Sequence, residues 1–279
     1  ERSTSSRIEL ASMRVSGSDH DGSFSSSKSS RRLRFLAIEK SRQARRKRRS
    51  DAAKFRAKEL SQKGFSLGKL LFMSALPQLD YITEEEYRDG EEISRVKHEW
   101  FNGVVYAMAG GTLNHAKICA NTTTSLQNAL RGKRCTAVGS ELRIKVESNG
   151  LHTYPDAVVF CPPSRFIGKG DSTLLTPKII FEVLSESTEN YDRTTKFNSY
   201  KTIPTLEEYV LIEQNRVWVD HFRRTNQNAW LHESYTALED VLRLESVEIE
   251  IPLTQIYEDL ELPNGLIALA PTPKDDFDE

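Results

Sequence analysis

Two short apolar runs, each interrupted by one carboxylate, constrain this chain most. They are YPDAVVF at residues 154–160, with Asp156, and KIIFEVLS at residues 178–185, with Glu182. The second run is nearly continuous and predicts a central strand buried on both faces. In the first, Pro155 favours a strand start or a sheet edge. A buried carboxylate is unfavourable without a partner, so each acid predicts either an ion pair with a nearby Arg or Lys or a cation site.

A helical segment follows the second run, at residues 187–203, with Ser187 or Thr188 as its expected cap. It places Asp192, Lys196 and Tyr200 at intervals of four residues, and therefore on one face. One interpretation of that face is an ordinary Asp–Lys ion pair on the helix surface. The other is that Lys196 supplies a positive charge next to the two strand carboxylates.

The elements around these runs predict an α+β or mixed α/β domain with one central sheet, over residues 73–265. We expect a capping box from Thr83 to Glu86 and a hairpin at Asn102-Gly103. An amphipathic helix should cover residues 112–132, and a second antiparallel hairpin residues 141–161. In that hairpin, Leu142, Ile144 and Val146 alternate with Glu141, Arg143 and Lys145. A strand pair around Gln214-Asn215 and edge strands at residues 230–236 and 246–252 complete the sheet, and residues 266–279 form an acidic tail.

The charge of the chain divides at about residue 72. Residues 1–72 hold 19 basic and 7 acidic residues, a net charge of +12, whereas residues 73–279 hold 20 and 33, a net charge of −13. The first part is rich in Ser and Arg and poor in apolar residues, so we expect it to be disordered or weakly helical on its own. Three interpretations stay open: a nucleic-acid-binding arm, a transit peptide, or sequence outside the functional protein, since Met73 begins a bacterial-looking start.

The cysteines and the hydropathy indicate the compartment. The chain has three cysteines, Cys119, Cys135 and Cys161. Their odd number and the lack of C-x-x-C spacing argue against a disulfide scaffold or a zinc site. We expect them to be small core residues in a reducing environment. No apolar run approaches the roughly 20 residues that span a bilayer. We therefore expect a cytoplasmic protein without a membrane partner.

Taken together, Asp156 and Glu182 fit a site for a hard cation. Mg²⁺ or Mn²⁺ is typically held by one or two carboxylates together with waters and substrate phosphate oxygens. Such an ion activates water and stabilises charge on a phosphate, and a lysine beside it adds to that stabilisation. The pattern predicts a metal-dependent, phosphodiester-cleaving centre with Lys196 as its third group.

The same segments resemble the Uma-type restriction endonuclease family, within the PD-(D/E)xK nuclease superfamily. The resemblance rests on YPDAVVF, EVLSEST, DRTTK and the following Tyr200, together with FNGVVYAMAGGTLNHAKI and SELRIKV upstream. It covers about residues 73–262. It implies a restriction-endonuclease-like core, a central mixed sheet flanked by helices, that cleaves DNA with Mg²⁺ held by Asp156 and Glu182.

The chain departs from the superfamily pattern at one catalytic position. The E-x-K motif would place a lysine at position 184, where this chain has Leu184. The resemblance implies that the lysine has moved to the helix as Lys196. Glu141 stands where the family usually has aspartate and is either a further acid near the metal or an exposed strand residue. His115 matches a recurrent family histidine and either orients water or phosphate or serves in capping and packing.

The leading hypothesis is thus a metal-dependent DNA endonuclease. The charge of −13 on residues 73–279 is a poor footprint for a phosphate-binding protein. Local cations, among them Arg143, Lys145 and Arg193, are the candidates for lining the DNA cleft, and the basic extension is a second source of affinity. The alternative is a catalytically inactive nuclease fold that serves as a binding or assembly module, including a homodimer formed through exposed strand edges.

Overall fold

The computed structural model describes residues 28–40, 81–108 and 110–262. Residues 28–40 form a helix at the start of this part of the chain. The elements that follow are α2 Glu84–Glu91, β1 His98–Phe101, β2 Val104–Ala107, α3 Leu113–Ala129, β3 Thr136–Gly139, β4 Arg143–Lys145, β5 His152–Thr153, β6 Ala157–Phe160, β7 Phe166–Ile167, β8 Thr173–Leu174, β9 Ile179–Leu184, α4 Glu189–Tyr191, a π-helical turn Asp192–Lys196, α5 Phe197–Tyr200, β10 Glu208–Glu213, β11 Val219–Arg224, β12 Trp230–Tyr235, β13 Val241–Leu244, a 3-10 turn Glu245–Val247, β14 Ile249–Pro252 and α6 Leu253–Ile256.

The fold is a mixed α/β arrangement with two six-stranded sheets rather than one. One sheet has the order β12-β11-β10-β9-β6-β3 and the other β2-β1-β5-β4-β8-β7, and β13 and β14 form a separate ribbon. Each large sheet is mixed, because β9 and β10 are parallel in the first and β4 and β8 in the second. The sequence predicted one central sheet, whereas the described residues form two large sheets. Strand β12 lies at a sheet edge, as expected.

The second sheet arises because the hairpin predicted at residues 141–161 divides between the two sheets. Its first half pairs as expected, with Ile144 opposite Thr153. The chain then leaves that sheet, and β6 pairs instead with β3 and β9. Pro155 lies at the crossing, where it cannot donate a ladder hydrogen bond. Asp156 consequently lies where the chain passes from one sheet to the other.

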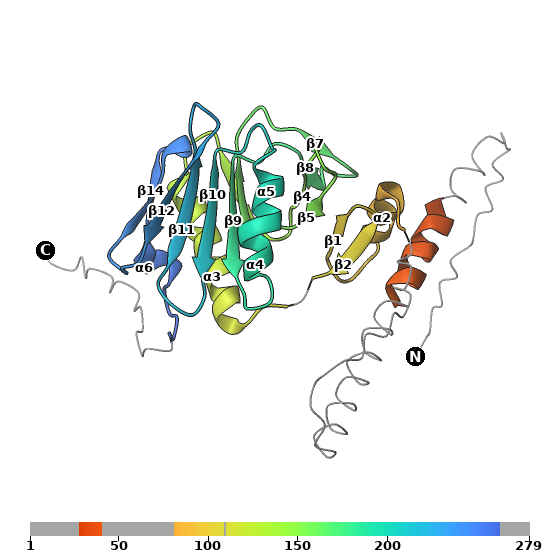
Figure 1. Ribbon diagram of the computed structural model, residues 1–279, viewed down its shortest axis with the longest axis horizontal. Coiled ribbons are helices and arrows are strands. Elements are labelled where there is room, and N and C mark those ends of the chain that lie inside the picture. Colours follow the sequence, from red (N-terminus) through yellow and green to blue (C-terminus); the bar gives the residue numbers. More distant parts are fainter. Residues whose placement is uncertain (1–27, 41–80, 109, 263–279) are drawn as a thin grey trace, which may run out of the picture.

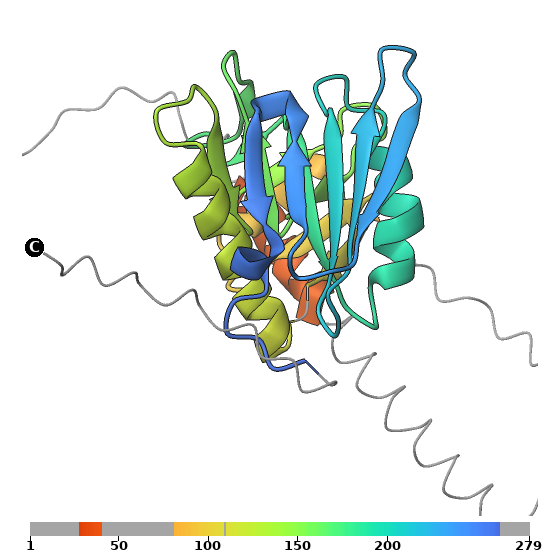
Figure 2. The ribbon, with the colours of Figure 1, turned by 90° about the vertical axis from the view of Figure 1, so that its left-hand side faces the viewer.

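Strand β9 is the centre of the first sheet, as its apolar sequence predicts. It is paired on both sides, and all six of its residues are buried. Figure 2 shows α3 on one face of this sheet and the α4–α5 segment on the other. Phe181 and Val183 pack toward α3, whereas Ile180 and Leu184 pack with Phe197 of α5 and its surroundings. By strand alternation, Glu182 faces the α4–α5 segment.

Several local predictions are confirmed. Thr83 and Glu86 form the capping box at the start of α2, and Asn102-Gly103 joins β1 to β2 with positive φ at both residues. Helix α3 begins after its N-cap Thr112 and buries one apolar face. Among the described residues, no helix has the length and apolar character needed to cross a bilayer.

The prediction about the cysteines is wrong for two of the three. Cys135 and Cys161 form a disulfide, and their Cα atoms are 4.1 Å apart. The cause lies in the register, because Thr136 pairs with Phe160 and the next residues outward are the two cysteines. Cys119 has a free thiol. Sequence spacing alone could not reveal a pair that only the β3–β6 ladder brings together.

Residues 28–40 belong to the extension expected to be disordered or weakly helical on its own, and in the structure they form a helix in contact with α2. Phe35 is fully buried and lies against Gly90 of α2, where an added Cβ would be 2.1 Å from its ring. Arg31 pairs with Asp89 at 2.8 Å, and Arg34 pairs with Glu86 at 2.5 Å. An apolar anchor and opposite charges thus hold the basic helix against the acidic face of α2 (Figure 1). The other residues of the extension lie outside the described part.

We expect Phe35→Ala to release this helix. The variant loses the buried ring that makes the main apolar contact between the helix and α2. The undocked form of the helix becomes more populated, and the rate of proteolysis follows that population. Tryptic cleavage at Arg31, Arg32 and Arg34, followed by mass spectrometry, should accelerate at least roughly tenfold. The matched control is Leu33→Ala, because Leu33 belongs to the same helix but is 67% exposed. Equal cleavage rates in the two variants would contradict the docking.

Candidate active site

A cleft of about 1150 Å³ opens where the two sheets meet at the C-terminal end of β9. Its walls come from β1 and β2, the start of α3, the end of β9 and the π-helical turn. The side chains that matter for its chemistry are Glu99, His115, Asp156, Glu182, Asp192 and Lys196. The fold therefore brings the three predicted catalytic residues, Asp156, Glu182 and Lys196, to one cavity.

Asp156 is fixed at the crossing between the sheets. The last pair of the β6–β9 ladder is Ala157 with Phe181, so Asp156 comes opposite Glu182 one step further on. The backbone N–H of Val183 donates to its Oδ2 at 2.7 Å, and His115 Nε2 lies 3.5 Å from the same oxygen. Burial alone would raise the pKa of Asp156, but the hydrogen bond and the charge of His115 hold it below its ordinary value. Asp156 is thus an ionised carboxylate, and its Oδ1 remains for a ligand.

Glu182 lies deeper and is only 3% exposed. The hydroxyl of Tyr200 donates to its Oε1 at 2.7 Å, and Lys196 Nζ lies 3.0 Å from the same oxygen. Burial raises the pKa of Glu182 well above its usual range, and the nearby carboxylates add to this effect. Both contacts end on Oε1, so Oε2 remains for a cation.

Lys196 is buried among three carboxylates. Its Nζ lies 3.0 Å from Glu182, 3.3 Å from Asp192 and 3.3 Å from Glu99. Burial favours the neutral amine, but the negative charge of Glu182, followed by the other groups, raises the pKa of Lys196 well above its ordinary value. The helix face that carries Asp192, Lys196 and Tyr200 is therefore directed at Glu182. The helix is π-helical over Asp192–Lys196.

The charges of the cleft do not balance. Four carboxylates, those of Asp156, Glu182, Asp192 and Glu99, face one lysine and one histidine. Buried like charges favour either proton uptake or a bound cation. Oxygen donors on two facing strands are the ligands that Mg²⁺ and Mn²⁺ prefer. The donor set therefore fits a divalent metal held by Asp156 and Glu182.

Glu99 is the member of the cluster that the sequence reasoning missed. It lies on β1, and the hydroxyl of Thr153 donates to its carboxylate. The available signal was the one used for Glu182, a carboxylate within a strand of apolar and aromatic residues. Its approach to Lys196 depends on how the two sheets pack, which no local pattern specifies.

Other predicted residues lie elsewhere. The side chain of Glu141 is 90% exposed and pairs with Lys97 at 2.6 Å, outside the residues that line the cleft. Arg143, expected on the strand face opposite Ile144 and named as a candidate to line the DNA cleft, is 4% exposed because α2 covers that face. Its guanidinium lies 5.3 Å from the Tyr87 ring centre and 6.0 Å from that of Tyr154. The expectation that Arg143 contacts DNA does not fit this burial.

The other two basic candidates are engaged in ion pairs. Lys145 Nζ lies 2.5 Å from Glu84. Arg193 bridges three acids, at 3.0 Å to Glu189, 3.0 Å to Glu213 and 2.6 Å to Asp220. Neither residue is among those lining the cleft.

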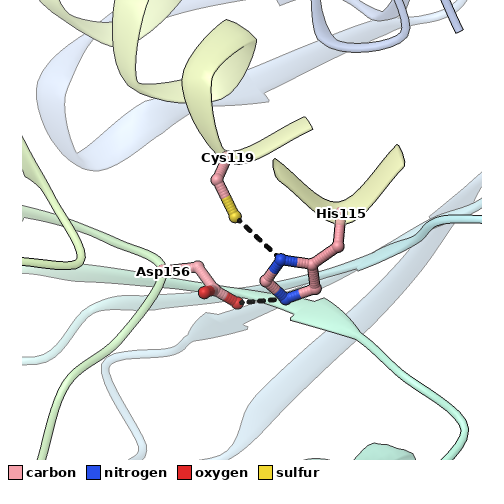
Figure 3. Close-up of side chains that lie close together, drawn as sticks. All are labelled: His115, Cys119 and Asp156. Atoms are coloured by element: carbon pink, nitrogen blue, oxygen red, sulfur yellow. Dashed lines mark hydrogen bonds and ion pairs between the residues drawn. The ribbon is translucent and has the colours of Figure 1, made fainter. Parts of the chain in front are cut away.

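The auxiliary residue His115 lies beside Asp156. The helix α3 also carries Cys119 one turn further on, and its Sγ lies 3.5 Å from His115 Nδ1 (Figure 3). Burial raises the pKa of the Cys119 thiol, and the charge of Asp156 raises it further. The thiol is therefore neutral in the metal-free protein rather than an activated nucleophile.

Taken together, these elements define a mixed α/β protein with a buried, carboxylate-rich cleft at a strand end. Residues 84–254 match the model of the Uma2 family, described as "Putative restriction endonuclease". The chain belongs to this family.

Two uncharacterized proteins and one solved structure are similar to this chain. Uncharacterized protein slr1290 of Synechocystis sp. is 36% identical over 179 residues, covering 64% of this chain and 93% of that protein. Uncharacterized protein sll1609 of the same organism is 30% identical over 150 residues, covering 54% and 85%. A crystal structure from Anabaena variabilis, described as a putative nuclease belonging to DUF820, has a TM-score of 0.48 and 15% identity over 58% of this chain and 90% of that one.

Proposed function

We propose that this protein is a metal-dependent endonuclease that hydrolyses phosphodiester bonds in DNA. The observation that carries the proposal is the cluster in the cleft, where Asp156 and Glu182 lie opposite each other beside Lys196. With Asp192 and Glu99, the cluster has four carboxylates against the two cationic groups of Lys196 and His115. Family membership agrees with this chemistry. Asp156 and Glu182 are the proposed ligands of Mg²⁺ or Mn²⁺.

Each residue has a distinct part in this scheme. A divalent ion in the site would supply Lewis-acid charge for a phosphate oxygen and lower the pKa of a water. Lys196 keeps a fixed positive charge at the cleft, held 3.0 Å from Glu182, where it stabilises negative charge that develops on the phosphate. Tyr200 orients Glu182 by donating to Oε1, which would leave Oε2 to hold the ion.

The negative charge of the folded part of the chain limits its affinity for DNA. The acidic charge of residues 73–279 opposes phosphate binding. Arg31 and Arg34, which belong to the basic extension, are paired with carboxylates of α2. We infer that productive binding depends on the metal in the cleft and on cations other than these, so that affinity is modest and falls with salt.

The test is a plasmid-nicking assay with added and chelated metal. The wild type is expected to convert supercoiled DNA to the open circle with Mg²⁺ or Mn²⁺ and not with chelator. Asp156→Ala removes one ligand, so the rate should fall roughly 100-fold or more, since even residues that only support metal ligands contribute about 10–100-fold.

The matched control is Glu250→Gln, which changes a carboxylate whose side chain is 64% exposed and does not line the cleft. It should keep the wild-type rate. Cleavage without metal, or equal cleavage by Asp156→Ala, would contradict the proposal. A folded wild type that binds DNA without nicking it would favour the binding or assembly module.

A further inference from the structure

On the α3 side of the cleft, a histidine and a cysteine lie next to one carboxylate of the cluster, Asp156. His115, Cys119 and Asp156 each offer one ligand atom, and these atoms lie within 4.8 Å of one another. Figure 3 shows the imidazole between the thiol and the carboxylate. The sequence argued against a zinc site because it has no C-x-x-C pair, but a His and a Cys four residues apart on one helix face offer another arrangement.

We propose that His115, Cys119 and Asp156 form a site for a borderline-soft divalent cation, of which Zn²⁺ is the type. Thiolate and imidazole ligands select such ions, whereas Mg²⁺ prefers oxygen donors alone. Three protein ligands beside an open cleft also match zinc sites that keep one position for water or substrate. His115 and Asp156 line that cleft, and Cys119 lies behind them.

The distances require only a small adjustment. Zinc bonds of about 2.0–2.3 Å place tetrahedral ligand atoms roughly 3.3–3.6 Å apart. The separation from Cys119 Sγ to His115 Nδ1 is 3.5 Å, and that from His115 Nε2 to Asp156 Oδ2 is also 3.5 Å. The two contacts use different ring nitrogens, but one ligand atom from each residue already lies within 4.8 Å of the others, so an ion would draw them together by roughly 1 Å.

The new site shares Asp156 with the hard-cation pair. An ion on Cys119 and His115 draws the carboxylate of Asp156 away from Glu182, and the two occupancies therefore oppose each other. By thermodynamic reciprocity, Mg²⁺ must weaken the soft ion as much as the soft ion weakens Mg²⁺. Zinc is thus an inhibitor of the Mg²⁺ centre rather than its substitute. This last statement rests on the proposed function, whereas binding of the soft ion does not.

The test uses Co²⁺ as a spectroscopic substitute for Zn²⁺ on the metal-free full chain. The wild type is expected to show a thiolate-to-cobalt charge-transfer band in the near ultraviolet, and Zn²⁺ should abolish it by displacement. Cys119→Ser should lose the band and bind Co²⁺ at least roughly tenfold more weakly. A Cys135→Ser and Cys161→Ser double variant should keep the band. A missing band in the wild type, or an unchanged band in Cys119→Ser, would overturn the site.

Competition is measured with and without DNA cleavage. Excess Mg²⁺ should weaken the Co²⁺ band of the wild type, an experiment that needs no nuclease activity. If nicking occurs, Cys119→Ser should nick DNA with Mg²⁺ at the wild-type rate but require at least roughly tenfold more Zn²⁺ for inhibition. Inhibition by Zn²⁺ that is equal in both proteins would overturn the antagonism. Absence of nicking, with the cobalt results intact, would count against the proposed function alone.

Discussion

Replacing Lys196 by alanine is expected to lower the free energy of unfolding by roughly 3–5 kcal/mol, the usual effect of removing one partner from a buried ion pair. Lys196 Nζ forms ion pairs with Glu182, Asp192 and Glu99, at 3.0, 3.3 and 3.3 Å. Without it, at least one buried carboxylate must take up a proton or draw in water. Denaturant unfolding of wild type and variant, in metal-free buffer, measures the difference.

Two further variants test that explanation. Lys178→Ala removes a lysine whose partner, Glu207, is half exposed at the surface, so it should change stability by no more than about 1 kcal/mol. Pairing Lys196→Met with Glu182→Gln removes both charges together, and this double variant should recover much of the stability lost in Lys196→Ala. A loss in Lys196→Ala no larger than that of the surface control would show that the cluster is not electrostatically coupled.

Replacing Cys135 by serine is expected to lower the free energy of unfolding by about 3–4 kcal/mol under non-reducing conditions. The disulfide joins residues separated by 26 positions, and chain-entropy arguments assign a closed loop of this size a stabilisation of that order. The bond also links β3 to β6, the strand that leads from Asp156 into the sheet. Denaturant unfolding of the variant, compared with wild type with and without reductant, measures the effect.

Cys119→Ser is the matched control, because Cys119 is free and belongs to α3 on the same side of the sheet. It should respond to reductant as the wild type does, whereas Cys135→Ser should show no further response. If reductant leaves the unfolding curve of the wild type unchanged, the bond does not contribute to stability in solution.

The parts of the fold that sequence predicted correctly are those whose cause is local. The capping box at Thr83, the turn at Asn102-Gly103 and the buried strand around Glu182 each depend on residues within one element. The same is true of the face that carries Asp192 and Lys196. For the site, this local information and the family resemblance selected Asp156, Glu182 and Lys196, and the structure places all three in one cleft.

The failures arise where distant segments meet. Arg143 alternates correctly with Ile144 along the strand, but α2 covers the face that alternation assigns to solvent. Glu99 and Lys196 are almost a hundred positions apart in the chain and meet only because the two sheets pack together. The Cys135–Cys161 bond likewise requires the β3–β6 register. The pattern within a segment predicts which of its residues share a face. The elements that pack against that face are determined by the fold of the whole molecule.

The docked helix at residues 28–40 has a consequence for the covalent chain that follows it. Because Phe35 is anchored against α2, the contact between this helix and the body of the protein joins two parts of one chain. The covalent connection keeps the helix at a high effective concentration near α2, since the entropic cost of closing a loop grows only slowly with its length. A single protease cut between the helix and residue 81 would leave two fragments held only by non-covalent contacts, those of Phe35, Leu36 and Ile38 and the ion pairs. Dilution would then separate them, although it cannot separate the intact chain.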